Sequence, residues 1–216
     1  MTSKIFQISI YSADLASIVL ALFSLLYCWR PYNPPYLRSF PVFTLINVFQ
    51  NSLEFFAPAL TQLSEVIFTL FEMLYFSYFL RKVLVRKRSR YVIGLFAISF
   101  IALYLFFVMK KVIVHAVGFL ATVEAFFLCI GCLLYFREQM LDPVGVDLSK
   151  NPAFWMVTAT IFYFALTIPS IFLYAWYSFK SKQDYALAAY SINNYAQVIN
   201  SVLYIKGITC RKKLLS

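Results

Sequence analysis

The chain has 216 residues, of which 62% are hydrophobic and 13% are charged, with a formal net charge of +10. About 25% of the residues of a typical soluble domain are charged, so this composition excludes an ordinary soluble protein and predicts one integral membrane domain over residues 1–216. The positive charge would suggest nucleic acid for a soluble protein, but in a membrane protein its distribution matters more than its total. We therefore expect the lipid bilayer as a partner and no nucleic acid.

Seven segments predict transmembrane helices, because a membrane-spanning helix needs about 20 mainly apolar residues. They lie near residues 7–28, 39–59, 62–84, 91–109, 112–136, 153–178 and 186–208. The first has no clear small-residue cleavage site, so we interpret it as a retained helix and not as a signal peptide. The predicted fold is an all-α, multi-pass seven-helix bundle.

Basic residues gather in the segments that follow the first, third, fifth and seventh predicted helices. They are Arg30, Arg38, Arg81, Lys82, Arg86, Lys87, Arg88, Arg90, Arg137, Lys150, Lys206, Arg211, Lys212 and Lys213. The other side receives Lys4, Lys110, Lys111, Lys180 and Lys182. The positive-inside rule then predicts a cytoplasmic C-terminus and an outside N-terminus in the inner (plasma) membrane.

The stretch from Asn47 to Glu72 is unusually polar for a membrane segment. Its polar residues recur on one helical face before a turn at Pro58 and again after it. They are Asn47, Gln50, Asn51 and Glu54, then Gln62, Glu65, Thr69 and Glu72. Ionisable groups at membrane depth cost roughly 2.5 to 3.5 kcal/mol each, so we expect these residues to face the bundle interior or a water-filled cavity.

Other predicted helices carry polar seams of the same kind. The sixth has Thr160, Tyr163, Thr167, Ser170 and Tyr174, and the seventh has Asn193, Gln197, Asn200 and Tyr204. The first adds Asp14 with Ser17, and the fifth adds Glu124. The alternative interpretation is interhelical hydrogen bonding, which contributes about 0.6 kcal/mol for each bond.

Depth separates the acidic residues. An α-helix rises by about 1.5 Å per residue. This rise places Asp14, Glu54 and Glu65 in the outer third, and Glu72 and Glu124 near mid-membrane. We expect no acidic residue in the cytoplasmic half of a helix. The outer half is then electronegative, which favours a cation or an amine over an anion, with outer-leaflet lipid headgroups as an alternative.

The candidate ligand-binding residues are Glu72, Glu124, Glu54, Glu65, Asp14, Asn51, Tyr163, Asn193, Gln197 and Asn200. Glu54 and Glu65 could instead simply reach the outer interface. Glu72 and Glu124 lie far from any predicted helix end, and their alternative role is structural, as protonated and hydrogen-bonded carboxyls. A proton held there would also make either one a proton-responsive element.

Several catalytic chemistries are disfavoured. Cys129 and Cys132 have the spacing of a redox pair, but they fall in the inner half of their helix, so we expect packing residues. His115 is the single histidine, which excludes a multi-histidine zinc site. Lys206 lies too near the cytoplasmic end for a retinal Schiff base. We therefore expect no enzyme activity, no cofactor and no metal site.

The basic run from Arg81 to Arg90 directly follows the third predicted helix. Anionic lipid headgroups are its expected partner, through Arg81, Lys82, Arg86, Lys87, Arg88 and Arg90. The alternative partner is a cytoplasmic signalling protein or another membrane protein.

Three segments resemble a pattern found in small uncharacterised multi-pass membrane proteins of Bacteroidota. They are SEVIFTLFEMLYFSYFLRKVL, NPAFWMVTATIFYFALTIP and INNYAQVINSVLYIKGITCRKK. The matching positions are Phe154, Trp155, Tyr163, Phe164, Asn193, Asn200 and Tyr204. The resemblance implies a similar seven-helix fold and carries no activity with it.

The leading functional hypothesis is a receptor-like membrane sensor that binds a small or cationic ligand in an outward-facing acidic cavity. One alternative is a small carrier or channel, proton-coupled through Glu72 or Glu124. Another is a structural subunit of a membrane complex, in which the polar seams only hold helices together.

Overall fold

The computed structural model describes residues 2–29, 33–141 and 148–210, without the side chains of residues 2, 3, 54, 55, 58, 59, 114, 115 and 175. These residues form helices, and no strand occurs among them. The seven long helices are α1 (Thr2–Cys28), α3 (Phe40–Phe56), α4 (Pro58–Val83), α5 (Lys87–Met109), α6 (Val117–Leu141), α7 (Pro152–Phe179) and α8 (Gln183–Thr209). A short helix α2 (Pro35–Arg38) and the 3-10 turns η1 (Ile113–Ala116) and η2 (Leu148–Lys150) lie between them. The predicted all-α, seven-helix architecture is confirmed.

Proline marks where several helices begin. Pro35, Pro58 and Pro152 each occupy the first position of a helix. Proline suits this position because its φ is already helical and its missing N–H has no partner to lose there. The break between α3 and α4 is a single residue, Ala57, so the predicted turn at Pro58 is tight.

Two hairpins at one end of the molecule close in the same way. Lys111 after α5 and Ser181 after α7 have positive φ values of 55° and 54°. The next residue donates its backbone N–H back across the turn, from Val112 to Phe107 O at 3.2 Å and from Lys182 to Tyr177 O at 2.9 Å. This pattern satisfies carbonyls at the helix ends and reverses the chain within a few residues.

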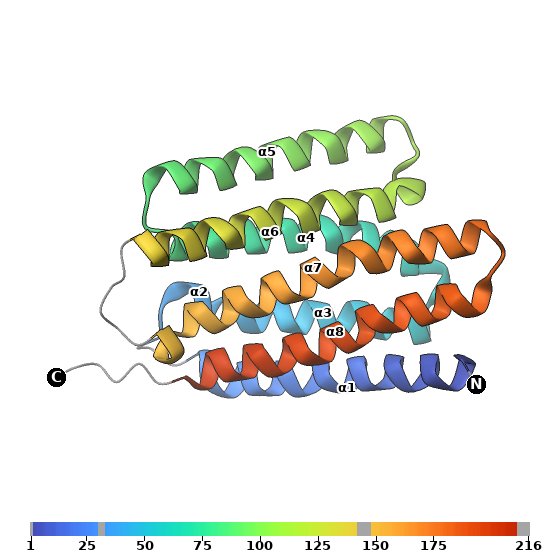
Figure 1. Cartoon of the computed structure of the whole chain (residues 1–216), viewed down its shortest axis with the longest axis horizontal. Helices are drawn as coiled ribbons and strands as arrows, with labels where there is room; N and C mark the ends of the chain where they lie inside the picture. Colours follow the sequence, from blue (N-terminus) through green and yellow to red (C-terminus); the bar gives the residue numbers. More distant parts are fainter. Residues whose placement is uncertain (1, 30–32, 142–147, 211–216) are drawn as a thin grey trace.

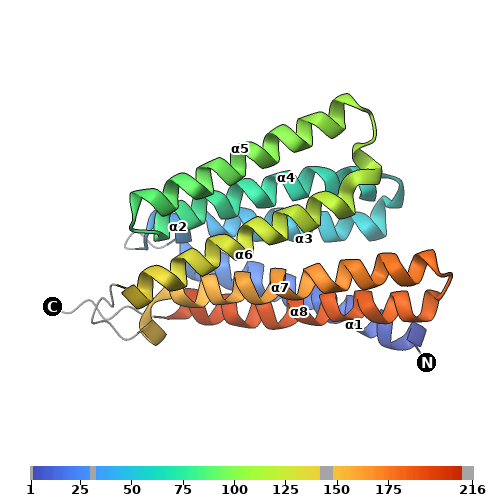
Figure 2. The ribbon, with the colours of Figure 1, turned by 45° about the horizontal axis from the view of Figure 1, so that its top comes forward.

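Six of the long helices form a closed ring. In order around the ring they are α1, α3, α4, α6, α7 and α8, and α8 packs against α1. Helix α5 lies outside the ring against α4 and α6, at the edge of the bundle (Figure 1, Figure 2). The ring leaves room for a central space, and α5 takes no part in enclosing it.

Five helices are long and apolar enough to cross a membrane: α1, α4, α5, α6 and α7. Helix α3 is short, at 17 residues, and α8 is the most polar of the long helices. Large apolar side chains point outward along the bundle, among them Leu15, Ile67, Ile98 and Phe126. A surface of this kind supports association with a membrane.

Helix α1 begins and helix α8 ends at opposite ends of the bundle (Figure 1). The end where α8 ends, called here the basic end, carries Arg38, Arg81, Lys82, Arg86, Lys87, Arg88, Arg90, Arg137, Lys150 and Lys206. The opposite end, where α1 begins, carries Lys4, Lys110, Lys111, Lys180 and Lys182. The helices alternate in direction, so the predicted sorting by end is present for the described basic residues. Arg30, Arg211, Lys212 and Lys213 lie outside the described residues.

One sequence expectation is wrong at α6. This helix continues beyond the predicted end near residue 136 to Leu141, so it includes Glu138. Glu138 is buried near the basic end, where no acidic residue was expected in a helix. Its carboxylate accepts the backbone N–H of Val85 at 2.7 Å and that of Arg86 at 3.3 Å, which ties the α4–α5 connection to α6.

Candidate functional site

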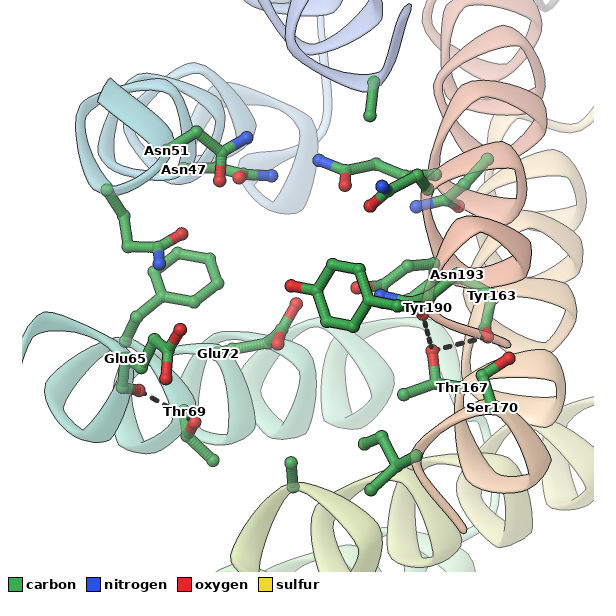
Figure 3. A pocket seen from close by; sticks show the side chains of 18 of the residues that line it. Asn47, Asn51, Glu65, Thr69, Glu72, Tyr163, Thr167, Ser170, Tyr190 and Asn193 are labelled. Carbon is green, nitrogen blue, oxygen red and sulfur yellow. Dashed lines mark hydrogen bonds between the residues drawn. The ribbon is translucent and has the colours of Figure 1, made fainter. Parts of the chain in front are cut away.

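The ring of six helices encloses a cavity of about 820 Å³. Polar side chains from all six helices contribute to its lining. Figure 3 shows those of α3, α4, α7 and α8. Small-molecule sites typically have volumes of about 300 to 1,000 Å³, so this cavity is large enough for an organic ligand. One water molecule occupies only roughly 30 Å³.

The cavity lies in the half of the bundle away from the basic end. Most of its lining residues come from the N-terminal part of α1, α4 and α6 and from the C-terminal part of α3 and α7, which meet at that end, and α8 lines it from Leu187 to Tyr204. On α4 they recur as Gln62, Glu65, Thr69 and Glu72, the face that the sequence periodicity predicts. Figure 3 shows Glu65 and Glu72 reaching in from α4 toward the amides of α3 and α8.

Among the described side chains, four carboxyl groups line this cavity: those of Asp14, Glu65, Glu72 and Glu124. Within the described part of the chain, no lysine, arginine or histidine lines it. Glu72 and Glu124, on the neighbouring helices α4 and α6, are close enough to interact electrostatically. The site therefore has a concentrated acidic character without a basic side chain to offset it.

Several oxygen atoms in the cavity wall are buried without a hydrogen-bond partner among the described residues. They are Oδ2 of Asp14, Oε1 of Glu124 and Oδ1 of Asn200. A buried acceptor left unpaired costs about 1 to 3 kcal/mol. Glu124 is the most enclosed of the three residues, with 2% of its surface exposed, so its oxygen is available to a donor that enters the cavity.

Amide and hydroxyl groups of the wall also join the helices to each other. Thr167 on α7 donates to Oδ1 of Asn193 on α8 at 2.9 Å. Gln197 donates to Ser17 on α1 at 2.9 Å, and Asn194 donates to Ser9 at 3.0 Å. These contacts match the interhelical hydrogen bonding that the sequence left open for the seams of α7 and α8.

Packed aromatic rings close the cavity toward the basic end. The rings that form this floor are Phe43, Phe76, Phe164 and Tyr204, all of them buried. Phe76 meets Phe164 edge to face with ring centroids 5.7 Å apart, and Phe43 stacks on Tyr75 at 4.5 Å. The Tyr204 hydroxyl is also within 3.0 Å of Thr160 Oγ1, which fixes its ring against α7.

The structure brings together nearly all of the residues predicted to bind a ligand. Those that line the cavity are Glu72, Glu124, Glu65, Asp14, Asn51, Tyr163, Asn193, Gln197 and Asn200. Glu54 lies on α3, but its side chain is outside the described residues. The convergence is a structural finding, whereas ligand binding by these residues stays a prediction.

The sequence reasoning missed several polar residues of the lining, among them Asn194 and Tyr190. Asn194 lies three residues before Gln197 and seven before Ser201, so a second helical face of α8 was readable from the same spacing. Tyr190, near the open end of α8, also lines the cavity. A tyrosine among many aromatic residues gives no periodic signal of its own.

Residues set aside by the sequence analysis lie away from the cavity. Cys132 is buried in the hydrophobic core, and Cys129 packs against that core. Lys206 is exposed, with its Nζ 5.9 Å from the Trp155 ring centroid. The side chain of His115 is outside the described residues.

Comparisons with protein-family models, curated proteins and solved structures found no match to this chain. The resemblance to Bacteroidota membrane proteins stays a prediction. Functional inference therefore rests on the cavity and its surroundings.

Proposed function

We propose that this chain is a receptor-like sensor of the plasma (inner) membrane, which binds a small organic cation in the central cavity. The observation that carries the proposal is the set of four carboxyl groups in the cavity wall, with no basic side chain lining it in the described residues. Such a wall attracts cations and repels anions. The free oxygen of Glu124 supplies an acceptor for an ammonium or guanidinium N–H.

The orientation proposed from the sequence fits this function. With the basic end in the cytoplasm, the start of α1 and the cavity lie toward the outer side of the membrane. A ligand then reaches Glu72 and Glu124 from outside, past Gln62 and Tyr190, which are exposed residues of the lining. The arginines and lysines of the basic end face the cytoplasmic leaflet, where anionic lipids or a signalling partner bind them.

A sensor is favoured over a carrier by the aromatic floor. A carrier needs a polar route to both faces of the membrane, and the floor of Phe43, Phe76, Phe164 and Tyr204 interrupts that route. A sensor needs no such route, because ligand binding only has to shift helices that also reach the cytoplasmic side. Helices α4 and α8 are two such helices, because each carries both cavity residues and basic residues of the basic end.

Calorimetric titration of the purified protein in detergent micelles tests the ligand class. Methylguanidinium is the probe, because it keeps its positive charge and offers several N–H donors. We expect it to bind, sodium to bind more weakly, and acetate not to bind. Glu72→Gln and Glu124→Gln should each weaken binding by about tenfold or more, since each removes a charge-assisted contact.

Glu138→Gln is the matched control, because Glu138 is a buried carboxylate on the same helix as Glu124 but lies outside the cavity lining. It should leave methylguanidinium affinity unchanged. Absence of methylguanidinium binding to the folded wild-type protein would overturn the proposed function.

Uptake into proteoliposomes separates the sensor from the carrier. Radiolabelled methylguanidinium should bind the reconstituted protein but should not accumulate inside the vesicles beyond protein-free controls. Saturable accumulation that is lost in Glu124→Gln would instead assign the cavity to a transport cycle.

A further inference from the structure

Two of the acidic groups of the cavity lie at different depths along α4, and the other described ones come from Asp14 on α1 and Glu124 on α6. Glu65 and Glu72 lie on the same face of this helix. Seven residues of helix correspond to about 10 Å along its axis. The carboxyl group of Glu72 lies close enough to that of Glu124 on α6 for the two to interact electrostatically. Glu65 lies two helical turns nearer the open end of the cavity. Figure 3 shows both α4 carboxyl groups on the cavity side of the helix.

The wall between these two positions is partly apolar. Phe68 and Thr69 lie between Glu65 and Glu72 on the cavity face of α4, and Thr69 turns its hydroxyl to the backbone oxygen of Glu65 at 2.8 Å. A phenyl ring and a threonine methyl group suit a hydrocarbon segment and not a second polar group. From Glu65 to Glu72, the cavity face of α4 is therefore acidic at both ends and partly apolar between them.

The size of the cavity makes a single small cation an incomplete occupant. The cavity has a volume of about 820 Å³. A ligand with a single ammonium group, bound at Glu72 and Glu124, would leave Glu65 without a partner from the ligand. An elongated molecule with positive charge at both ends fills the length and neutralises both acidic positions. The buried and unpartnered Oε1 of Glu124 marks where its inner end would donate a hydrogen bond.

We infer that the cavity selects a linear dication, an α,ω-diamine or polyamine. One ammonium group lies between Glu72 and Glu124, the methylene chain runs along Phe68, and the second ammonium group pairs with Glu65. This inference rests on the proposed function, because it specifies which cation the acidic cavity prefers.

A chain-length series tests the inference. Wild-type protein in detergent micelles is titrated with α,ω-diamines of increasing length and with the primary monoamine of each length as the matched control. Affinity should pass through a maximum at the length that bridges about 10 Å. At that length the diamine should bind about tenfold more tightly than its monoamine, because it makes a second ion pair in an enclosed site.

Substitutions at the two acidic positions should separate the two ends of the ligand. Glu65→Gln should weaken the diamine more than the monoamine and so remove most of the diamine's advantage, because only the diamine pairs directly with Glu65. Glu72→Gln should weaken both ligands. Glu65→Asp, which keeps the charge on a shorter side chain, should move the optimum to a longer diamine and provides a second test if Glu65→Gln does not fold.

Two negative results have different meanings. If monoamines bind as tightly as diamines at every length, or if Glu65→Gln leaves the diamine advantage intact, the dication inference is overturned while the proposed cation site stands. If neither amines nor methylguanidinium bind the folded protein, the proposed function fails and the inference fails with it.

Discussion

Helix α6 carries two buried glutamates with opposite surroundings. Glu138, 5% exposed near the basic end, accepts the backbone N–H groups of Val85 and Arg86. Glu124, 2% exposed in the cavity half, leaves Oε1 without a partner among the described residues. Burial alone therefore does not distinguish a structural carboxylate from a binding one, whereas the presence or absence of an internal donor does.

The same contrast extends to the two halves of the bundle. Toward the basic end, large rings such as Phe40, Phe76 and Phe79 fill the space between helices. Toward the other end, the ring of helices opens around carboxyl and amide groups. The packed half contributes to stability, whereas the cavity half contains polar groups without hydrogen-bond partners among the described residues. Substitutions in the two halves should therefore change the free energy of unfolding with different signs as well as different sizes.

The largest loss of stability should follow Phe76→Ala in the aromatic floor. Phe76 is buried and packs against Phe43 and Phe164. Truncation of such a side chain leaves a cavity that costs about 3 to 5 kcal/mol. Reversible unfolding in micelles measures the difference. Phe126→Ala on the outward face of α6 is the matched control and should change stability much less, because Phe126 is 57% exposed.

Glu138→Ala should be the next most destabilising change. It removes the acceptor for Val85 N–H and Arg86 N–H. Hydrogen bonds to a charged group contribute about 1.5 to 3 kcal/mol. Glu138→Gln retains an acceptor oxygen and should lose less. Both variants should keep wild-type ligand affinity, and a large drop in affinity with either one would contradict the division between the two glutamates.

Glu124→Gln should act in the opposite direction on stability. It removes a buried ionisable group that has an oxygen without an internal donor. The free energy of unfolding should therefore stay the same or rise by about 1 kcal/mol. Ligand affinity should fall at the same time. A loss of stability comparable to that of Glu138→Ala would show that Glu124 is a structural residue.

A pair of glycines gives the smallest expected effects. A Cβ on Gly207, between α8 and α7, would lie 3.2 Å from atoms of Met156 and Trp155 and 3.3 Å from the Pro152 backbone oxygen. Gly207→Ala should therefore destabilise by about 1 kcal/mol despite its better helix propensity. Gly118→Ala in the cavity wall meets its nearest neighbour, Ile171, at 4.0 Å and should be neutral or slightly stabilising. Thermal unfolding of the two variants side by side checks this order.

Helical periodicity was enough to predict the cavity side of several helices. Glu65, Thr69 and Glu72 recur on one face of α4, and that face does turn inward. The spacing of Asn193, Gln197 and Asn200 likewise predicted the inner face of α8, because polar groups are excluded from an apolar surface whatever the exact packing.

Long-range partners could not be predicted in this way. The acceptor role of Glu138 depends on a connection more than fifty residues earlier in the chain and on α6 continuing to Leu141. Helix ends are weakly specified by local sequence, because tertiary contacts decide how far the last turns extend. The aromatic floor could not be predicted from the sequence either, because phenylalanine is abundant along the chain and only the packing of the helices decides which rings meet.

The most direct test of the central claim is site-resolved labelling of carboxyl groups in native membranes. Dicyclohexylcarbodiimide enters apolar protein regions and modifies accessible carboxyls there, and peptide mass spectrometry identifies each modified residue. We expect modification at Glu124 and Glu72, protection of both by methylguanidinium, which does not couple to activated carboxyls as a primary amine does, and little modification of Glu138, whose oxygens are held by backbone N–H groups. Equal modification of Glu124 and Glu138, or modification of Glu124 that no cation prevents, would contradict a cation-binding cavity.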